Sequence, residues 1–157
     1  MSTKLPSEKL KEMGIELPTT AVSFGTYVPA VHVGNQVWVS GQLPVVDGKL
    51  PMTGHVGEEV TLEQAKELAR NSIINGLAAI NSLVGVDKIT RVIKVVGFVS
   101  SAPTFFQQAD VINGASDFLG EVFGDKGVHA RSALGTSLLP LNSPLEIEMV
   151  VEVSETA

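Results

Sequence analysis

The sequence predicts a single α+β domain in which two helices pack on one face of a mostly antiparallel sheet. The chain has 157 residues, a length that favours one domain. Its hydrophobic pattern gives the order strand, strand, helix, strand, helix, strand, strand, which is typical of this architecture. We expect residues 1–20, with a short charged helix at 6–13, to be an N-terminal extension. Residues 21–157 then form the domain.

The composition excludes several classes of function. No cysteine is present, which removes disulfides, thiolate metal sites and cysteine nucleophiles and is compatible with the cytoplasm. The net charge of -6 and the 11 scattered basic residues argue against nucleic acid as the main partner. No segment has the roughly 18 consecutive apolar residues of a membrane span. We therefore expect a cytoplasmic protein that binds neither nucleic acid nor a membrane.

A β-hairpin is expected near the start of the domain. Residues 30–33 and 36–39 are rich in β-forming side chains and flank Gly34-Asn35, a pair typical of two-residue hairpin turns. The second strand ends at residues 40–42. Proline and glycine then recur through a long loop, at Pro44, Gly48, Pro51, Gly54 and Gly57.

Two amphipathic helices are expected. Apolar side chains recur every three or four positions through residues 62–84, after Thr61, which can cap the helix in a capping box with Gln64. Pro103 and Thr104 open the second helix, and its apolar stripe continues to a stop at Gly124.

Three further strands complete the pattern. Residues 89–100 are apolar on both faces, so both faces need covering, and one helix layer covers only one of them. Residues 131–139 and 145–153 are expected to form a hairpin. The last strand alternates between apolar and polar side chains, which indicates one buried face and one open face.

Several common catalytic motifs are absent from the chain. It has no phosphate-binding loop, no Gly-x-Gly-x-x-Gly run and no Gly-x-Ser-x-Gly elbow. His32, His55 and His129 share no metal-ligand spacing. From these residues alone we expect no metal site.

Arg131 is the first candidate site residue. Its neighbours in the expected strand are small, so space is left beside a guanidinium, whose planar fork suits bidentate binding of a carboxylate. The alternative is a solvated arginine, or one paired with a surface acid.

Glu146 and Gly41 are further candidates. Glu146 lies opposite the apolar row of its strand, where a carboxylate can orient or deprotonate water. Alternatively, it belongs to a solvated face shared with Glu148 and Glu152. Gly41 can let a ligand approach backbone N–H groups, or can simply mark the end of a strand.

The expected C-terminal hairpin separates the two candidates. It places Arg131 opposite Val153, and Glu146 is about seven residues further along, at least ~20 Å away. Such a pair cannot share one small ligand within a chain. If both act on it, Glu146 must come from a neighbouring subunit, and the protein must be a symmetric oligomer.

Three segments resemble one protein family. Ala130-Arg-Ser-Ala-Leu-Gly-Thr-Ser-Leu-Leu-Pro140, followed by Leu145-Glu-Ile-Glu148, resembles the C-terminal signature of the Rid family, the reactive-intermediate deaminases also called YjgF-like proteins. Phe24-Gly-Thr-Tyr27 and Val39-Ser-Gly-Gln-Leu-Pro44 resemble two motifs near that family's N-terminus. The resemblance extends from about Val22 to Val153.

The resemblance implies a chorismate-mutase-like fold and a homotrimer with a cleft at each subunit interface. It also implies hydrolysis of 2-imino and enamine acids to 2-keto acids and ammonia, without cofactor or metal. The carboxylate-binding arginine of the family falls on Arg131 and the water-orienting glutamate on Glu146. Its cleft tyrosine falls on Tyr27, and its Ser-Gly pair falls on Ser40 and Gly41.

The resemblance also shows where this chain departs from the family. The helix asparagine of the family falls on Asn113. At Ala133 the chain departs from the family, because many deaminases carry a cysteine there, so only the backbone of Ala133 can contribute. His129 and Thr26 replace prolines. Two alternatives therefore accompany the deaminase hypothesis: a non-catalytic trimer that binds keto acids or related carboxylates, and RNA cleavage, against which the acidic charge argues.

Overall fold

The computed structural model describes residues 4–19 and 25–155. Phe24, part of one resembling motif, lies outside these ranges. The described helices and strands are, in chain order, α1 (Pro6–Glu12), β1 (Ala30–Val33), β2 (Gln36–Gln42), α2 (Leu62–Leu83), β3 (Ile89–Ser100), α3 (Gln108–Phe123), β4 (Ala130–Thr136) and β5 (Leu145–Val153), with short 3₁₀ turns between some of them.

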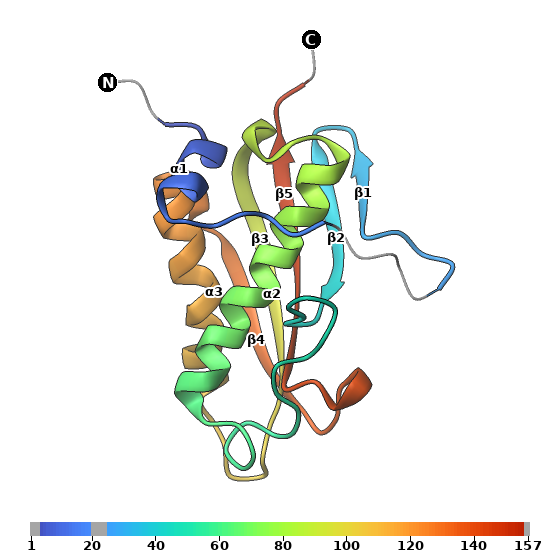
Figure 1. Cartoon of the computed structure of the whole chain (residues 1–157), viewed down its shortest axis with the longest axis vertical. Coiled ribbons are helices and arrows are strands. Elements are labelled where there is room, and N and C mark those ends of the chain that lie inside the picture. Colours follow the sequence, from blue (N-terminus) through green and yellow to red (C-terminus); the bar gives the residue numbers. More distant parts are fainter. Residues whose placement is uncertain (1–3, 20–24, 156–157) are drawn as a thin grey trace.

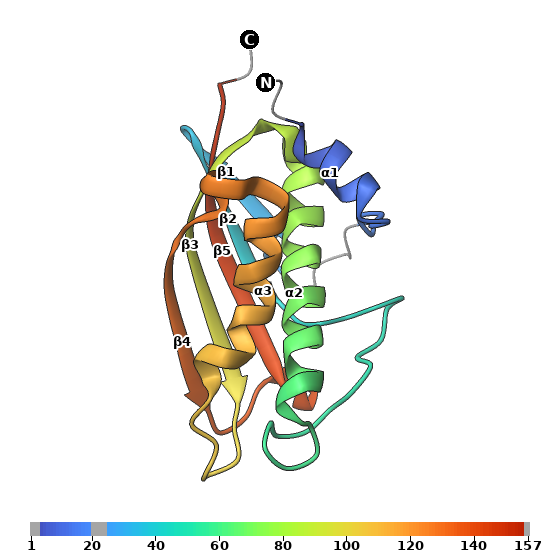
Figure 2. The same ribbon diagram turned by 90° about the vertical axis from the view of Figure 1, so that its left-hand side faces the viewer.

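The five strands form one sheet in the order β1-β2-β5-β3-β4. Three neighbouring pairs are antiparallel, and β3 and β4 are parallel. Helix α2 packs over β2 and β5, and α3 packs over β3 and β4 (Figure 1). Figure 2 shows both helices on the same side of the sheet. The predicted α+β architecture, with two helices on a mostly antiparallel sheet, is confirmed.

The predicted C-terminal hairpin is wrong. Strands β4 and β5 do not pair, because β3 lies between them. Arg131 pairs with Val95 of β3, and Val153 pairs with Ile89 at the other end of that strand. Strands β3 and β4 are joined through α3, and such a crossover makes the two strands parallel. The eight-residue connection from β4 to β5 passes the end of β3, and periodicity alone does not distinguish it from a hairpin loop.

Other boundaries are closer to the prediction. The hairpin β1–β2, helix α2 and strands β3 and β5 lie where the pattern placed them. The side chain of Thr61 accepts a hydrogen bond from the Gln64 backbone, and the Gln64 side chain accepts one from the Thr61 backbone, so the capping box is confirmed. Helix α3 begins at Gln108, four residues later than predicted, because Thr104 belongs to a turn and Phe105 packs on the core from a loop.

Strand β4 is shorter than predicted. It ends at Thr136 rather than at Leu139. The chain then passes through Pro140–Asn142, where Leu141 and Asn142 adopt positive φ angles of 58° and 57°. These left-handed conformations turn the chain away from β4 and towards the start of β5.

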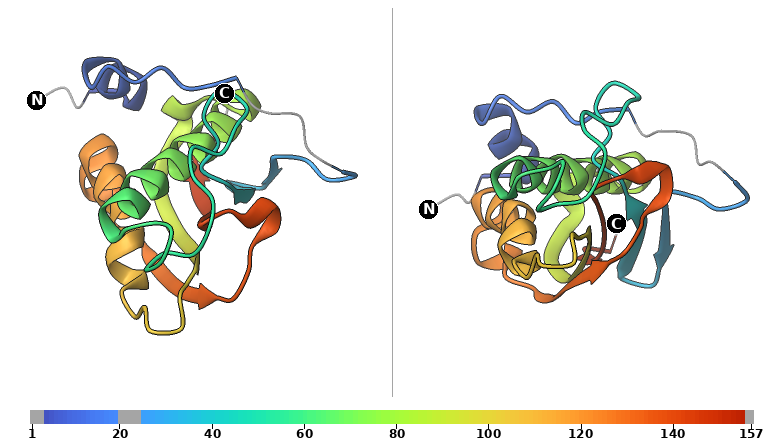
Figure 3. Two further views of the ribbon diagram at one scale, coloured as in Figure 1. Left: turned by 60° about the horizontal axis from the view of Figure 1, so that its bottom comes forward. Right: turned by 90° about the horizontal axis from the view of Figure 1, so that it is seen from below.

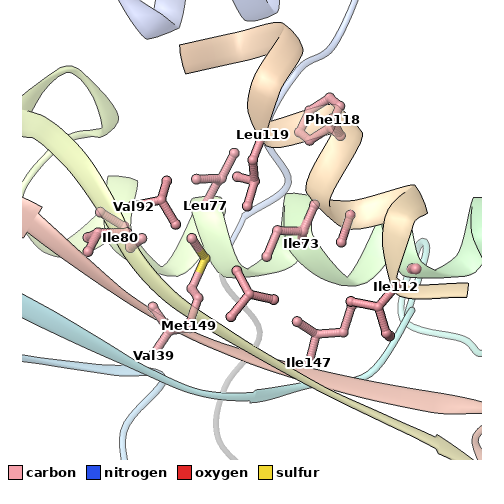
Figure 4. Packing of buried hydrophobic residues seen from close by; sticks show 14 of the residues in the cluster. Val39, Ile73, Leu77, Ile80, Val92, Ile112, Phe118, Leu119, Ile147 and Met149 are labelled. Atoms are coloured by element: carbon pink, nitrogen blue, oxygen red, sulfur yellow. The ribbon is translucent and has the colours of Figure 1, made fainter. Parts of the chain in front are cut away.

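The hydrophobic core lies between the helices and the sheet (Figure 4). Its largest side chains come from both helices and from the inward face of β5. They are less than 3% exposed and include Ile73, Leu77, Ile80, Ile112, Phe118, Leu119, Ile147 and Met149. The alternation of β5 is therefore confirmed: its odd-numbered side chains enter the core, and its even-numbered ones face the other side of the sheet.

Helix α1 packs outside the two long helices (Figure 3). Its Ser7 donates two hydrogen bonds, from its backbone N–H and its hydroxyl, to the carboxylate of Asp87. Leu10 is 2% exposed, and three apolar residues after the helix pack against the core. The N-terminal segment is thus attached to the domain at several points. Within the described ranges, no helix is both long and apolar enough to cross a membrane.

The outer face of the sheet has no helix over it (Figure 2). Trp38 is 55% exposed there, and Leu134 is 50% exposed. Val96, Phe98 and Val150 of the neighbouring strands share this face and are only half-buried. The second covering layer that the apolar pattern of residues 89–100 requires is therefore not supplied by the described part of this chain.

Gly114 of α3 lies against the backbone of α2. A Cβ atom at this position would overlap the backbone carbonyl oxygen of Lys66, whereas a Cβ at Gly120 on the same helix has open space around it. We expect Gly114→Ala to lower the free energy of unfolding by about 1–3 kcal/mol, because a backbone atom cannot move aside easily. The matched variant Gly120→Ala should raise it by about 0.5–1 kcal/mol. Denaturant titration of both variants tests this, and equal effects would contradict the helix packing.

Candidate functional site

Arg131 lies on the edge strand β4 and points towards the helix layer. Its ladder partner Val95 is fully buried under the helices, and paired residues share a face of the sheet. One guanidinium nitrogen, Nη1, donates to Asn113 Oδ1 at 2.7 Å and to Ser116 Oγ at 3.1 Å. Asn113 and Ser116 are three positions apart on α3 and therefore lie on one helix face.

The rest of the Arg131 fork is available to a ligand. Among the described residues, none accepts a hydrogen bond from its Nε or Nη2 atom, and this edge of the fork matches the two oxygens of a carboxylate. Asn113 uses its carbonyl oxygen towards Arg131, so its two amide N–H donors point elsewhere. An open groove of about 320 Å³ adjoins these groups and is lined by Asn113, Ser116, Gly120, Gly127, Val128, His129 and Arg131.

Glu146 lies on the opposite face of the sheet. Its neighbours in β5, Leu145 and Ile147, point into the core, so its own side chain points to the face that no helix covers. The carboxylate lies directly over Gly41 of β2, where an added Cβ would overlap Glu146 Oε1. Gly41 therefore does more than end a strand: it leaves the space that the Glu146 side chain occupies.

The environment of Glu146 favours its protonated form. Burial raises the pKa of the Glu146 carboxyl above its ordinary value, and the negative charge of Glu148 raises it further. A carboxylate with a raised pKa takes a proton from water more readily than an ordinary surface glutamate does. Glu146 is therefore suited to act as a general base.

Ser40 and Tyr27 lie near Gly41. The Ser40 hydroxyl donates to the carbonyl oxygen of Val28 at 2.6 Å, and the Ser40 backbone N–H donates to the carbonyl oxygen of Pro29 at 2.9 Å. These two bonds attach the segment that enters β1 to strand β2. Tyr27, which precedes that segment, is 52% exposed. Ser40 thus positions the chain next to Tyr27 and leaves its ring accessible.

The predicted site residues form two groups. The first, which we call the Arg131 half-site, contains Arg131, Asn113 and Ala133; Ala133 pairs with Gly97 and so shares the inward face with Arg131. The second, the Glu146 half-site, is on β2, β5 and the segment before β1, and contains Tyr27, Ser40, Gly41 and Glu146.

The two half-sites do not meet within one chain. Strand β5, which carries Glu146, is separated from β4, which carries Arg131, by β3, and this corresponds to about 10 Å at the usual spacing of strands; Ser40 and Gly41 on β2 are one strand further away. Arg131 and Glu146 also point to opposite faces. The sequence-based inference that one chain cannot place both residues on one small ligand therefore holds. The reason given for that inference is wrong. The predicted hairpin separated the two residues along its length, whereas in the structure β3 lies between their strands and their side chains point to opposite faces of the sheet.

The sequence analysis missed Ser116 and assigned no role in the site to His129. Ser116 Oγ lies 2.9 Å from His129 Nε2, and His129 Nδ1 lies 2.6 Å from the Gly127 carbonyl oxygen. Both residues line the Arg131 groove. Their signal in the sequence is the three-residue spacing from Asn113 to Ser116. This spacing indicates a contact between Ser116 and Arg131 only once Asn113 is known to contact Arg131.

One cluster could hold a metal ion. In His55, Glu58 and Glu59, three potential ligand atoms lie within 4.8 Å of one another. Two of these residues already make contacts with the backbone: His55 Nε2 lies 2.7 Å from the Ser137 carbonyl oxygen, and Glu59 accepts from the His55 N–H. The cluster is next to the residue that follows β4, at the other end of that strand from Arg131. The absence of a metal in the candidate site stays a prediction.

Comparison with known proteins matches residues 7–153 to the family described as "YjgF/chorismate mutase-like, putative endoribonuclease". The chain belongs to the YjgF family. Protein TCP17 from Trypanosoma cruzi is 38% identical over 147 residues, which cover 92% of each chain.

Two further relatives of this YjgF-family protein bear on its fold and site. The crystal structure of Atu1372, a protein of unknown function from Agrobacterium tumefaciens, has 42% identity and a TM-score of 0.86, and the match covers 95% of this chain and 92% of that one. The 2-iminobutanoate/2-iminopropanoate deaminase of Dermatophagoides farinae is 30% identical over 140 residues, covering 88% of this chain and 94% of its own. The expected family and its chorismate-mutase-like fold are confirmed.

The raised pKa of Glu146 predicts a pH-dependent cost in stability. The folded state binds this proton more tightly than the unfolded state, so stability falls as pH rises from about 4 through the raised pKa. Glu146→Gln cannot ionise, and we expect it to gain stability relative to the wild type over that window. Unfolding titrations at several pH values test this.

The matched variant Glu148→Gln separates the two causes of the shift. It removes one negative charge and leaves the burial of Glu146 intact, so we expect the pKa of Glu146 to fall but to stay above its ordinary value. Carbon-13 NMR of the carboxyl groups measures this directly. An unchanged pKa in Glu148→Gln would contradict the electrostatic part of the explanation.

Proposed function

We propose that this protein hydrolyses small 2-imino and enamine acids to 2-keto acids and ammonia in clefts between its subunits. The observation that carries the proposal is the Arg131 fork, which lines a groove and has no described hydrogen-bond acceptor at its Nε and Nη2 edge, while Nη1 is held by α3. Such a fork suits a small carboxylate. The relative named 2-iminobutanoate/2-iminopropanoate deaminase supplies the class of substrate.

A homotrimer is part of this proposal. The uncovered sheet face carries exposed Trp38 and Leu134 together with half-buried apolar side chains, and an apolar face of this kind usually marks an interface. A closed ring of identical subunits buries the same patch on each of them. In such a ring the β4 edge of one subunit can adjoin the β1–β2 side of the next, which would join an Arg131 half-site to a Glu146 half-site.

The two half-sites would then divide the chemistry. The substrate carboxylate binds the free edge of Arg131, with the Asn113 amide donors beside it. Glu146 of the adjacent subunit takes a proton from a water molecule as the water oxygen attacks the C=N carbon. The resulting tetrahedral intermediate carries a hydroxyl and an amino group on one carbon. With a substrate protonated on its imine nitrogen, this intermediate is neutral. Glu146 then returns the proton to nitrogen. As the C–N bond breaks, the hydroxyl proton passes back to the Glu146 carboxylate, and ammonia and the keto acid leave.

No strong catalyst is needed for this reaction. An imine carbon is already electrophilic, so fixing its carboxylate and placing a water molecule provides most of the rate increase. Glu146 acts on a water proton, and its raised pKa makes it a stronger base for that transfer. Tyr27 and Ser40 border the Glu146 half-site and would shape the cleft.

A non-catalytic trimer that binds keto acids is the second candidate. Ala133, which lies on the inward face two residues from Arg131, has no reactive side chain. The Arg131 half-site alone is sufficient to bind a carboxylate. Such a protein would bind 2-ketobutyrate and release no ammonia from any imine. We place either form of the protein in the cytoplasm, an assignment that cell fractionation tests.

Substitution of Arg131 tests the proposed function. An amino-acid oxidase generates the imine in place, and the release of ammonia and the binding of 2-ketobutyrate are measured on the wild type and on Arg131→Ala. Loss of a charge-assisted bidentate contact costs about 3 kcal/mol, so we expect kcat/KM to fall about a hundredfold. The control Arg70→Ala removes an arginine that stacks on Phe118 away from the groove, and it should keep full activity.

The outcomes separate the candidates. Ammonia release that depends on Arg131 supports the deaminase. Keto-acid binding that depends on Arg131, without ammonia release by the wild type, supports the binding module. If Arg131→Ala matches the wild type in both measurements, the carboxylate site is elsewhere. RNA incubated at low salt serves as a further control, because the family description includes endoribonuclease. We expect it to stay intact at this net charge of -6.

A further inference from the structure

Four polar groups form a continuous row of hydrogen bonds that begins at Arg131 and ends at the Gly127 carbonyl group. Arg131 Nη1 contacts Ser116 Oγ at 3.1 Å, Ser116 Oγ contacts His129 Nε2 at 2.9 Å, and His129 Nδ1 contacts the Gly127 carbonyl oxygen at 2.6 Å. The row joins strand β4 to helix α3 and to the turn that precedes the strand. All of its members line the groove of the Arg131 half-site.

The last acceptor fixes the direction of every bond in the row. A carbonyl oxygen can only accept, so His129 Nδ1 must carry a hydrogen and donate it to Gly127. In the neutral ring Nε2 is then an acceptor, and the Ser116 hydroxyl donates its hydrogen to it. The oxygen of Ser116 consequently presents its lone pairs to Arg131, which can only donate.

The direction of the Ser116 hydroxyl matters for Arg131. A serine hydroxyl rotates freely and can present its hydrogen instead of its lone pairs to a neighbour. A hydrogen turned towards the guanidinium would repel it. His129 removes this alternative, because Nε2 takes the hydroxyl hydrogen. Hydrogen bonds that are aligned in one direction also strengthen one another.

The remaining contact of Arg131 complements the row. Asn113 Oδ1 accepts from the same Nη1 atom at 2.7 Å, so two acceptors from one face of α3 hold that nitrogen. A long arginine side chain otherwise loses rotamer freedom when it binds a ligand. Holding Nη1 beforehand removes part of that cost and leaves the Nε and Nη2 edge of the fork for a ligand.

We propose that Ser116 and His129 are positioning residues, which hold the Arg131 guanidinium in the orientation that binds a carboxylate. His129 acts through Ser116, and neither residue touches the substrate. This inference rests on the proposed function only for the identity of the ligand. The ordering of the Arg131 side chain is a property of the free protein and can be measured without a substrate.

Nitrogen-15 NMR of the arginine side chains measures that ordering. We expect slow rotation and slow hydrogen exchange for the Arg131 guanidinium in the wild-type protein. Ser116→Ala removes the acceptor, and His129→Phe keeps a ring of similar size without its nitrogens. Both variants should make the Arg131 guanidinium rotate and exchange at least several times faster. His129→Gln, whose amide oxygen can take the Ser116 hydrogen, should restore most of the ordering.

Calorimetry with 2-ketobutyrate gives the second readout. Loss of one hydrogen bond to a charged group should weaken binding about tenfold in Ser116→Ala and in His129→Phe. The double variant should be no weaker than Ser116→Ala alone, since His129 acts through Ser116. Ser7→Ala is the matched control. Ser7 lies on the N-terminal helix, and its hydroxyl also makes a short hydrogen bond, at 2.7 Å to Asp87, so its removal should change neither readout.

The two readouts keep this inference separate from the proposed function. If the wild type binds no keto acid, the proposed function fails, and the NMR measurement still decides the role of Ser116 and His129. Wild-type ordering of Arg131 in both single variants would overturn the inference. Full additivity of the two substitutions would also overturn it, because His129 would then act independently of Ser116. A thermal unfolding curve for each variant shows whether a loss of Arg131 ordering or of keto-acid binding reflects misfolding. If another variant misfolds, His129→Gln, the mildest change, still tests the inference.

Discussion

The alternation of side chains across one five-stranded sheet determines what this chain can do alone. Arg131 shares the inward face with Val95, whereas Glu146 lies between two core residues and faces outward. A pleated strand offers no way to bring both side chains to one face without a change of register, which would also expose the core. A site that uses both residues therefore requires a second copy of the chain, and the uncovered apolar face supplies a surface on which that copy can pack.

In each half of the site, a polar side chain is held in a way that costs stability locally, and neighbouring residues make this arrangement possible. In the Glu146 half-site, Gly41 has no side chain, so the Glu146 carboxylate can lie over the backbone of β2. Burial there raises the pKa of Glu146. In the Arg131 half-site, helix α3 uses Asn113 and Ser116 to hold one nitrogen of Arg131. Neither arrangement strengthens the hydrophobic core. Both fit the proposed ligand, which would need a fixed cation and a protonatable acid.

The sequence predicted the helices and strands themselves better than it predicted which strands pair with one another. Periodicity placed α2, β3 and β5, because each buries a continuous apolar row whose spacing survives in the sequence. It misplaced β4, since the small residues around Arg131 carry no such row and the partner of β4 is decided by α3, which connects β3 to β4 and packs over both strands. The motif residues Arg131 and Glu146 could be found from the sequence. The support from Ser116 and His129 could not, because it depends on which helix covers the edge strand.

Mixed assemblies test most directly whether one site is shared between two chains. Chains carrying Arg131→Ala and chains carrying Glu146→Gln are each expected to be inactive when assembled alone. Combined in equal amounts and allowed to form random trimers, about one quarter of the interfaces would join an intact Arg131 to an intact Glu146, so about a quarter of wild-type ammonia release should return. Mixed trimers that form, as shown by mass spectrometry, and yet release no ammonia would contradict the shared site.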